Sequence, residues 1–349
     1  MVRPAIGPEE KDLVRIAVDA MGGDQGVGVV VEGAVAAVRE FGCAVTLTGV
    51  EEEIWRHLKG QEISNLPINI HNAPEVVEMH EMPSAALRKK KNSSIRRGIE
   101  LIKHGEADAF ISAGNTGAVM ATALVVLGPI PGVERPAIAA VMPTLKDYTI
   151  LIDVGANVDC KPRHLLQFAI MGHIYARDIL GKDRPRVGLL SVGEEESKGN
   201  ELVRETFKAL EESPLYFIGN VEGRDVFNGT ADVVVSDGFT GNVALKIGEA
   251  VAETLEGLLK GELSKDPWTK LGYILMRPAF RRFKKRVDYS EYGGAPLLGV
   301  NGVCIISHGR SSAKAIKNAI RVARECLENK VIPHIREGIA QGWGGLYEV

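Results

Sequence analysis

The sequence predicts an α/β protein in which helices cover a mostly parallel β-sheet. Short apolar segments alternate along the chain with longer segments whose apolar residues recur at helical spacing. Glycine-rich runs follow many of the short segments, as expected where strands lead into loops. The chain has 349 residues, of which 45% are hydrophobic and 25% charged, and this is enough for a sizeable core.

The short apolar segments are the expected strands. Two of them stand close together on either side of Lys146-Asp147, and this spacing predicts a hairpin. The expected strands lie at residues 14–18, 44–48, 68–71, 109–112, 137–142, 149–154, 187–191, 216–218, 232–236 and 303–307.

The longer amphipathic segments are the expected helices. Ile95, Ile99 and Ile102 recur at helical spacing in one of them, and apolar residues from Ala313 to Leu327 share one face of the last. The expected helices lie at residues 29–39, 51–58, 93–103, 116–127, 165–180, 201–211, 242–259 and 312–328.

Domain organisation is expected to be simple. The length allows one large domain or two of ordinary size. The sequence shows no internal repeat and no low-complexity linker, so we expect residues 1–349 to form one domain. Within it, residues 260–290 are expected to form a basic, amphipathic helical excursion.

Charge and cysteine usage exclude several classes of protein. A net charge of −3 gives no indication of a nucleic-acid partner. The four cysteines lie far apart, without a CxxC pair or a histidine cluster, so we expect no metal and a reducing cytosol. The first twelve residues lack the apolar run of a signal peptide. No run reaches the roughly 18 uncharged apolar residues that a membrane-spanning helix needs.

Five loops at the ends of expected strands have the composition of anion sites. Those at 112–118, 193–200 and 236–242 lead into expected helices, whose first N–H groups carry partial positive charge. Each loop taken alone fits a helix cap or a turn equally well. Because ligands bind beyond the carboxyl ends of the strands in such sheets, we expect several loops to share one site for phosphate or an oxyanion. The five loops are residues 18–24, 112–118, 153–162, 193–200 and 236–242.

The expected site residues come from these loops and from the end of a late strand. Lysines would supply positive charge, although a lysine alone is more often a solvated surface residue. Asp153 and Asp237 could orient a lysine or simply cap a turn. His308 could donate to an oxyanion or act as a general acid, and a structural histidine fits it as well. The expected catalytic residues are Asn157, Lys161, Lys198 and His308, and the expected phosphate or oxyanion ligands are Gly114, Asn115, Thr116, Gly117, Asp153, Gly199, Asn200, Asp237, Gly241 and Asn242.

Several familiar catalytic motifs are absent. The chain has neither the GxxxxGK[ST] motif of nucleotide-binding P-loops nor the GxSxG elbow of serine hydrolases. Gly26-Val27-Gly28 is only a fragment of a dinucleotide fingerprint, because Val31 replaces its third glycine. Cys160 fits an inert thiol better than a nucleophile.

Two basic stretches are candidates for contact with an acidic protein partner or a membrane. The first contains Arg88, Lys89 and Lys90. The second, at residues 267–287, has seven Lys/Arg and no acid around large apolar side chains, and it includes Arg281, Arg282, Lys284 and Lys285. It fits a membrane surface, an acidic protein partner, or a helical hairpin buried at a dimer contact.

The loops above, together with residues 219–225, 292–300 and 307–309, resemble the bacterial phosphate acyltransferases of phospholipid synthesis, the acyl-carrier-protein:phosphate transacylases. The resemblance runs from about Val14 to Glu328 and is least close at 263–290. It implies a three-layer α/β/α sandwich of the isocitrate dehydrogenase and phosphotransacetylase type. It further implies a homodimer in the cytoplasm, associated peripherally with the inner face of the cell membrane and without a metal or cofactor.

The implied reaction moves a long-chain acyl group from acyl carrier protein to inorganic phosphate, and a membrane glycerol-3-phosphate acyltransferase uses the acyl phosphate. Phosphate is itself a nucleophile, so the enzyme needs only to hold it against the thioester carbonyl and stabilise the oxyanion. Two alternatives stay open. One is a short-chain phosphotransacylase that uses acyl-CoA, and the other is a non-catalytic scaffold that binds membranes or lipids.

Overall fold

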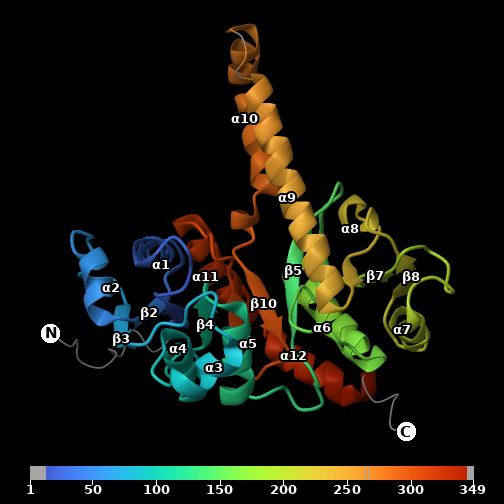
Figure 1. The fold of residues 1–349 in the computed structure, drawn as a ribbon, viewed down its shortest axis with the longest axis horizontal. Coiled ribbons are helices and arrows are strands. Elements are labelled where there is room, and N and C mark those ends of the chain that lie inside the picture. Colours follow the sequence, from blue (N-terminus) through green and yellow to red (C-terminus); the bar gives the residue numbers. More distant parts are fainter. Residues whose placement is uncertain (1–12, 264, 266, 344–349) are drawn as a thin grey trace.

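A single mixed sheet runs through the molecule in the order β3-β2-β1-β4-β11-β10-β5-β6-β9-β7-β8 (Figure 1). The structure is a computed structural model and describes residues 13–263, 265 and 267–343. The strands of the described residues are β1 (Arg15–Asp19), β2 (Ala44–Gly49), β3 (Ile68–Asn72), β4 (Ala109–Ser112), β5 (Ala137–Pro143), β6 (Tyr148–Ile152), β7 (Val187–Leu190), β8 (Phe217–Val221), β9 (Val233–Val235), β10 (Ala295–Leu298) and β11 (Val303–Ile306).

Most neighbouring strands are parallel, as predicted. The exceptions lie at the centre, where β10 is antiparallel to β11 and β5, and β5 is antiparallel to β6. The β5–β6 pair is the predicted hairpin, with Ala139 opposite Ile152 and Pro143 opposite Tyr148. Strand β10 was not predicted, because its four residues include a proline and follow two glycines, which together resemble a loop.

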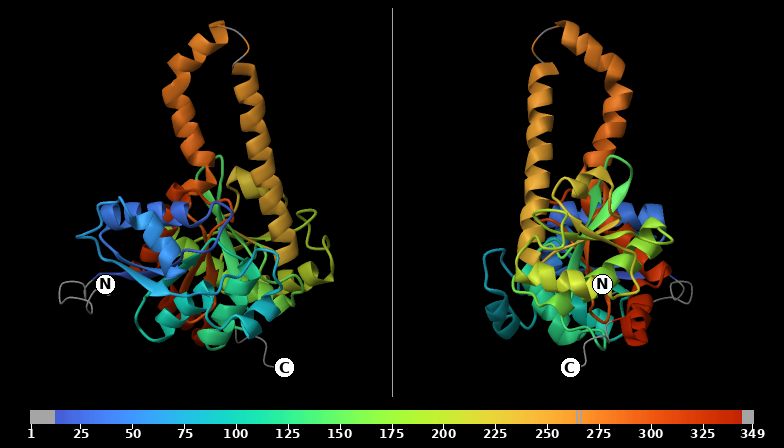
Figure 2. Two further views of the ribbon diagram at one scale, coloured as in Figure 1. Left: turned by 60° about the vertical axis from the view of Figure 1, so that its left-hand side comes forward. Right: turned by 90° about the vertical axis from the view of Figure 1, so that its right-hand side faces the viewer.

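Helices cover both faces of the sheet, so the predicted three-layer architecture is confirmed (Figure 2). Successive strand residues point to opposite faces, and in β1 Ile16 and Val18 join one core while Ala17 joins the other. The first core is covered by α1, α2, α6, α7, α11 and α12, and the second by α3, α4, α5 and α8 and the start of α9.

The predicted helices are confirmed, with their ends shifted by a few residues. Serine caps support two of them, since Ser93 Oγ accepts from Arg96 N at 3.3 Å and Ser312 Oγ accepts from Ala315 N at 3.3 Å. The helices are α1 (Val27–Phe41), α2 (Glu51–Leu58), α3 (Pro83–Lys89), α4 (Ser94–Lys103), α5 (Thr116–Val126), α6 (Pro162–Leu180), α7 (Glu201–Glu211), α8 (Asp225–Asn228), α9 (Gly238–Leu263), α10 (Pro267–Val287), α11 (Ala313–Glu328) and α12 (Val331–Gly338), with short turns η2 (Tyr289–Glu291) and η3 (Ile339–Trp343).

Helix α9 begins four residues earlier than predicted, so part of the expected loop 236–242 is helical. Asp237 Oδ1 accepts from Thr240 N at 2.9 Å and caps the first turn. The glycines at 238 and 241 make this segment resemble a loop, but they are needed for close packing, as described below. Asn242 therefore lies on a helix, and its position is fixed by the helical backbone.

Helices α9 and α10 project from the sheet as a long hairpin (Figures 1 and 2). Helix α10 continues through Pro278. This hairpin is the excursion predicted at 260–290, although its first leg begins at Gly238. No helix of the described chain combines the length and the apolar composition needed to cross a membrane.

Candidate active site

The loop after β6 is organised around a buried carboxylate. Asp153 is fully buried and accepts five hydrogen bonds of 2.7–3.2 Å, from the N–H groups of Ile138, Gly155, Ala156 and Asn157 and from Asn157 Nδ2. Burial raises the pKa of the Asp153 carboxyl, and these hydrogen bonds oppose the rise because they favour the charged form. Asp153 therefore shapes the loop and has no free face for an anion.

Asn157 helps to hold the same loop in place. Its Nδ2 also donates to Pro136 O at 2.7 Å, and its own carbonyl accepts from Gly238 N at 2.7 Å. The predicted catalytic residue Asn157 thus joins the β6 loop to the start of α9.

The first turn of α9 packs directly against this loop. A Cβ on Gly241 would lie 1.9 Å from the carbonyl oxygen of Asp153, and a Cβ on Gly238 would lie 2.6 Å from that of Asn157. Only glycine permits this approach. Asn242 directly follows Gly241, and its side chain lies over Gly155, where an added Cβ would be 3.5 Å from Asn242 Cγ.

The loop after β4 has a matching organisation. Asp19 is buried at the end of β1 and accepts from Ser112 Oγ at 2.7 Å, while Ser112 Oγ accepts from Gly114 N at 2.9 Å. Burial raises the pKa of the Asp19 carboxyl. The two buried aspartates therefore hold the two loops that face each other across the central strands.

Asn115 caps α5 and holds a neighbouring segment in place. Its Oδ1 accepts from Ala118 N at 3.0 Å, and its Nδ2 donates to the carbonyl oxygens of Glu78, Met79 and Glu81 at 3.0–3.3 Å. The buried amide is thus engaged with the protein itself. Asn115 positions the wall that carries Met79.

These loops enclose a cavity of about 640 Å³ at the carboxyl ends of β4, β6 and β11. Its volume is typical of small-molecule sites. Its lining includes five of the predicted site residues, together with polar groups that the sequence did not single out. The polar and glycine residues of the lining include Asp24, Gly114, Thr116, Gly117, Gly155, Asn242, Lys246, Glu249, His308 and Gly309.

His308 is positioned at the cavity by the loop after β11. Its Nδ1 accepts a hydrogen bond from Arg310 N at 3.0 Å. A neutral imidazole that accepts at Nδ1 carries its proton on Nε2. His308 can therefore offer an N–H to a substrate atom or transfer that proton.

Lys246 and Glu249 were missed by the sequence analysis. Both lie on α9 and line the cavity one and two turns beyond Asn242. The signal that could have found them is the helical spacing of Asn242, Lys246 and Glu249, which places three polar side chains on one face. Burial raises the pKa of the Glu249 carboxyl, and the neighbouring cationic side chains of Arg310 and Lys246 oppose the rise.

Replacing Glu249 with glutamine is expected to stabilise the protein in a pH-dependent way. The folded state binds the Glu249 proton more tightly than the unfolded state. The free energy of unfolding of the wild type therefore falls as the pH rises above 4.5, the ordinary pKa of a glutamate side chain. His308, Arg310, Lys246 and Glu253 also face this carboxyl and are unchanged in the variant. The Tm advantage of Glu249→Gln should therefore be small at pH 5 and larger at pH 8. A difference in Tm that is the same at both pH values would contradict the assignment.

Several predicted residues lie outside the cavity lining. Lys161 is exposed just before α6, and its N–H donates to His164 Nδ1 at 3.1 Å. Asn200 caps α7, with Oδ1 accepting from Val203 N at 2.9 Å. Lys198 and Gly199 precede it in the same loop, and Asp237 caps α9. Roles in catalysis for these residues stay predictions.

The predicted basic contacts lie on two separate elements. Arg88 and Lys89 are exposed on α3, whereas Lys90 forms an ion pair with Glu81. Arg281 and Arg282 are exposed on α10. The side chains of Lys284 and Lys285 lie outside the described residues.

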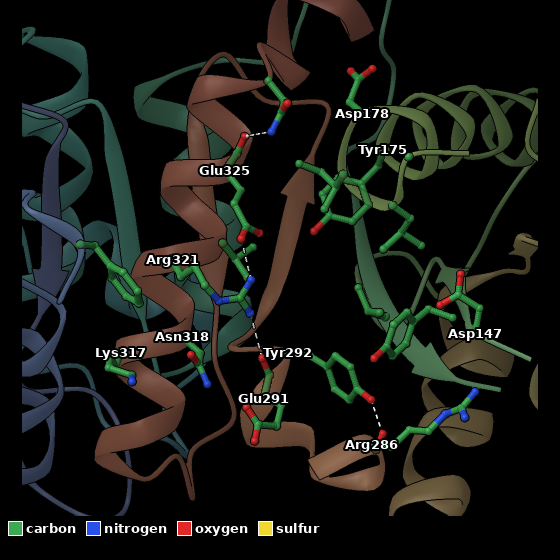
Figure 3. Close-up of a pocket in the computed structure, with 18 of the residues that line it drawn as sticks. Asp147, Tyr175, Asp178, Arg286, Glu291, Tyr292, Lys317, Asn318, Arg321 and Glu325 are labelled. Atoms are coloured by element: carbon green, nitrogen blue, oxygen red, sulfur yellow. Dashed lines mark hydrogen bonds and ion pairs between the residues drawn. The ribbon is translucent and has the colours of Figure 1, made fainter. Parts of the chain in front are cut away.

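A larger cavity, of about 1150 Å³, lies on the other face of the sheet between α6 and α11 (Figure 3). Its lining mixes both signs of charge, and these charges are largely paired, as Arg321 is with Glu325 at 2.6 Å and Lys317 with Glu40 at 2.7 Å. None of the predicted site residues other than Arg282 lines it. The 640 Å³ cavity is therefore the better candidate for chemistry. Within the described part of the chain, no three His, Cys, Asp or Glu side chains are grouped to hold a metal ion.

Comparison with known proteins places the chain in a family. The family model for "Fatty acid synthesis protein" matches residues 14–334. A phosphate acyltransferase from Trichlorobacter lovleyi is 54% identical over 334 residues, which is 96% of this chain and 97% of that protein. One from Pelobacter propionicus is 55% identical over 328 residues, covering 94% and 95%.

The solved structure of a phosphotransacetylase from Streptococcus pyogenes shares the fold, with a TM-score of 0.63 and 20% identity over 91% of this chain and 95% of that one. The chain therefore belongs to the fatty acid synthesis protein family and is an acyltransferase.

Proposed function

We propose that this protein transfers a long-chain fatty acyl group from acyl carrier protein to inorganic phosphate, giving acyl phosphate for glycerophospholipid synthesis. The observation that carries the proposal is the convergence of the start of α5, Asn242, Lys246 and His308 on one cavity. The names of the relatives, which are phosphate acyltransferases, support the same reaction. We also propose that residues 1–349 form one domain, because a single sheet continues through both halves of the chain.

The cavity offers groups suited to each stage of this reaction. The first N–H groups of α5, at Thr116 and Gly117, and the Lys246 ammonium would hold the phosphate dianion. A phosphate oxygen attacks the thioester carbonyl, and Asn242 Nδ2 would stabilise the oxyanion. When the C–S bond breaks, His308 Nε2 would give its proton to the departing thiolate. The products are acyl phosphate and carrier protein with a free thiol.

A turnover assay with purified protein tests the reaction. Palmitoyl-loaded acyl carrier protein and inorganic phosphate are expected to give free carrier thiol and acyl phosphate in equal amounts, and no thiol without phosphate. Release from acetyl-CoA but not from the carrier thioester would favour a short-chain phosphotransacylase. Absence of turnover with both donors would favour a non-catalytic scaffold.

The carrier protein is proposed to dock beside Met79, where the segment held by Asn115 leads into α3 and its exposed Arg88 and Lys89. Acyl carrier proteins are acidic, so basic side chains at the cavity wall suit them.

Salt is therefore expected to weaken carrier docking. Raising the ionic strength from 50 to 300 mM should raise KM for the carrier thioester about tenfold through screening, with kcat little changed. The double change Arg88→Ala and Lys89→Ala should mimic the effect, and Lys208→Ala on α7 serves as the control. Equal salt sensitivity of wild type and the double variant would argue against docking at α3.

A homodimer is proposed from the apolar face of α9. Phe239, Val243, Ile247, Val251 and Leu255 recur every four residues and are all exposed in the single chain. Such a contiguous exposed stripe marks an interface. Sedimentation should give twice the chain mass for wild type and a smaller mass for Val251→Glu; a monomeric wild type would exclude the dimer.

We further propose a cytoplasmic location with peripheral association at the inner face of the cell membrane. Trp268, Ile274 and Leu275 are exposed on α10 among Arg277 and Arg281, a composition suited to an anionic bilayer surface. A membrane glycerol-3-phosphate acyltransferase would consume the product there. Co-sedimentation with vesicles rich in anionic lipid tests the association, and recovery of all protein in the supernatant would exclude it.

A further inference from the structure

The lining of the 640 Å³ cavity contains a large apolar part that the phosphate chemistry does not use. Strand β5 contributes Ile138 and Ala140 to it, and two helices contribute Met120 and Leu245. The apolar residues of the lining include Met79, Met120, Ile138, Ala140, Val141, Val154, Leu245 and Ile306.

This apolar part is continuous with the core on one face of the sheet. Ile138, Ala140, Val154 and Ile306 are buried members of that core, and Met120 and Leu245 are partly buried against it. Phosphate and carrier protein are both strongly anionic and gain nothing from such a surface. An acyl chain gains affinity from such a surface, because each buried methylene raises the binding constant about fourfold.

Strand β5 forms a firm boundary of the cavity. It is paired on both sides, with Ala140 opposite Leu151 of β6 and Ile138 opposite Leu297 of β10. A strand that is paired on both sides cannot shift its backbone to make room for a larger side chain. In a close-packed interior, the added volume must therefore be taken from the cavity. The side chain at position 140 is a single methyl group, so it leaves space that a larger residue would fill.

We propose that the apolar lining holds the acyl chain and that Ala140 determines the chain length that the site accepts. The inference rests on the proposed function, because it assigns a place to the acyl group of that reaction. It adds a specificity-determining residue on β5, well separated in sequence from the loops that carry the polar groups.

Chain-length profiles of position 140 variants test the inference. We expect Ala140→Leu to lower kcat/KM for palmitoyl carrier thioester at least tenfold while the value for octanoyl carrier thioester stays within twofold. The added side chain takes the space of about three methylenes, and the loss of their burial would cost up to about sixtyfold. Ala140→Val, which suits a strand better, should give a smaller loss in the same direction.

Turnover of the octanoyl substrate shows in the same experiment that the variant is folded and that its polar groups are in place. Val125→Leu, on the exposed side of α5, is the control and should leave both values unchanged. An unchanged ratio of palmitoyl to octanoyl activity in Ala140→Leu, or an equal loss of both, would overturn the inference and leave the proposed function intact. A wild-type protein inactive on palmitoyl carrier thioester would instead overturn the proposed function, and the inference with it.

Discussion

Replacing Gly241 with alanine is expected to abolish acyl transfer and to destabilise the protein by about 3 kcal/mol or more. The added Cβ would lie 1.9 Å from the carbonyl oxygen of Asp153 and 2.6 Å from Ser236 Oγ. The Asp153 carbonyl oxygen cannot move freely, because its loop is held by five hydrogen bonds to the Asp153 carboxylate. Helix α9 must therefore shift outward and take Asn242 and Lys246 away from the cavity. Thermal unfolding and the turnover assay measure the two effects.

Gly257→Ala is the matched control on the same helix. A Cβ at Gly257 would meet nothing within 4 Å in the single chain. Replacing an exposed helical glycine with alanine contributes about 0.5–1 kcal/mol of stability. The control should keep its activity with an equal or higher Tm. If Gly241→Ala behaved in the same way, the close contact between α9 and the β6 loop would not control the site.

Replacing Lys246 with methionine is expected to lower kcat/KM by about 10²–10³-fold with little change in Tm. Lys246 is an exposed cation on α9 that lines the cavity, and methionine keeps most of its apolar stem while removing the charge. The loss should appear as a higher KM for phosphate or as a lower kcat, because the Lys246 ammonium is proposed to bind the phosphate dianion.

The matched control for this change is Lys260→Met, three to four turns further along α9. Lys260 forms an exposed ion pair with Glu256 at 2.8 Å, far from the cavity lining, and exposed pairs of this kind contribute little. Its activity should stay within twofold of wild type. A similarly small effect of Lys246→Met would assign the phosphate to other groups.

Local patterns in the sequence were sufficient for the fold class and for most elements. Alternating apolar periods located the strands and helices. In the structure, Ser93 and Ser312 cap two of these helices through bonds to residues three positions further along, so these helix starts depend only on neighbouring residues. Two extended runs close together located the β5–β6 hairpin, and motifs spread along the chain identified the family.

Elements with weak local patterns were missed or displaced. Strand β10 is short and contains Pro296, so its place in the sheet depends on pairing with β5 and β11. The start of α9 resembles a loop because Gly238 and Gly241 are required by packing against another segment, which no local pattern records.

Which of the predicted residues line the site could not be identified from the sequence alone, because their contacts are made with segments far away in the chain. Asn115 and Asn157 have side chains suited to substrates, but they donate to the carbonyl oxygens of Met79 and Pro136, which are distant in sequence, and a sequence does not show those contacts. Asp153 is held by its own loop and by Ile138 N on β5. Lys198 follows β7, and because β9 stands between β7 and β6, its loop lies outside the cavity lining.

The sequence by itself determined that this protein is an α/β acyltransferase with glycine-rich loops at the ends of its strands, because periodicity and motifs act over short distances. Only the tertiary structure decided which loops meet, that Lys246 and Glu249 face them, and that Ala140 borders an apolar space. Strand order and helix orientation arise from long-range packing, and that packing assembles the cavity.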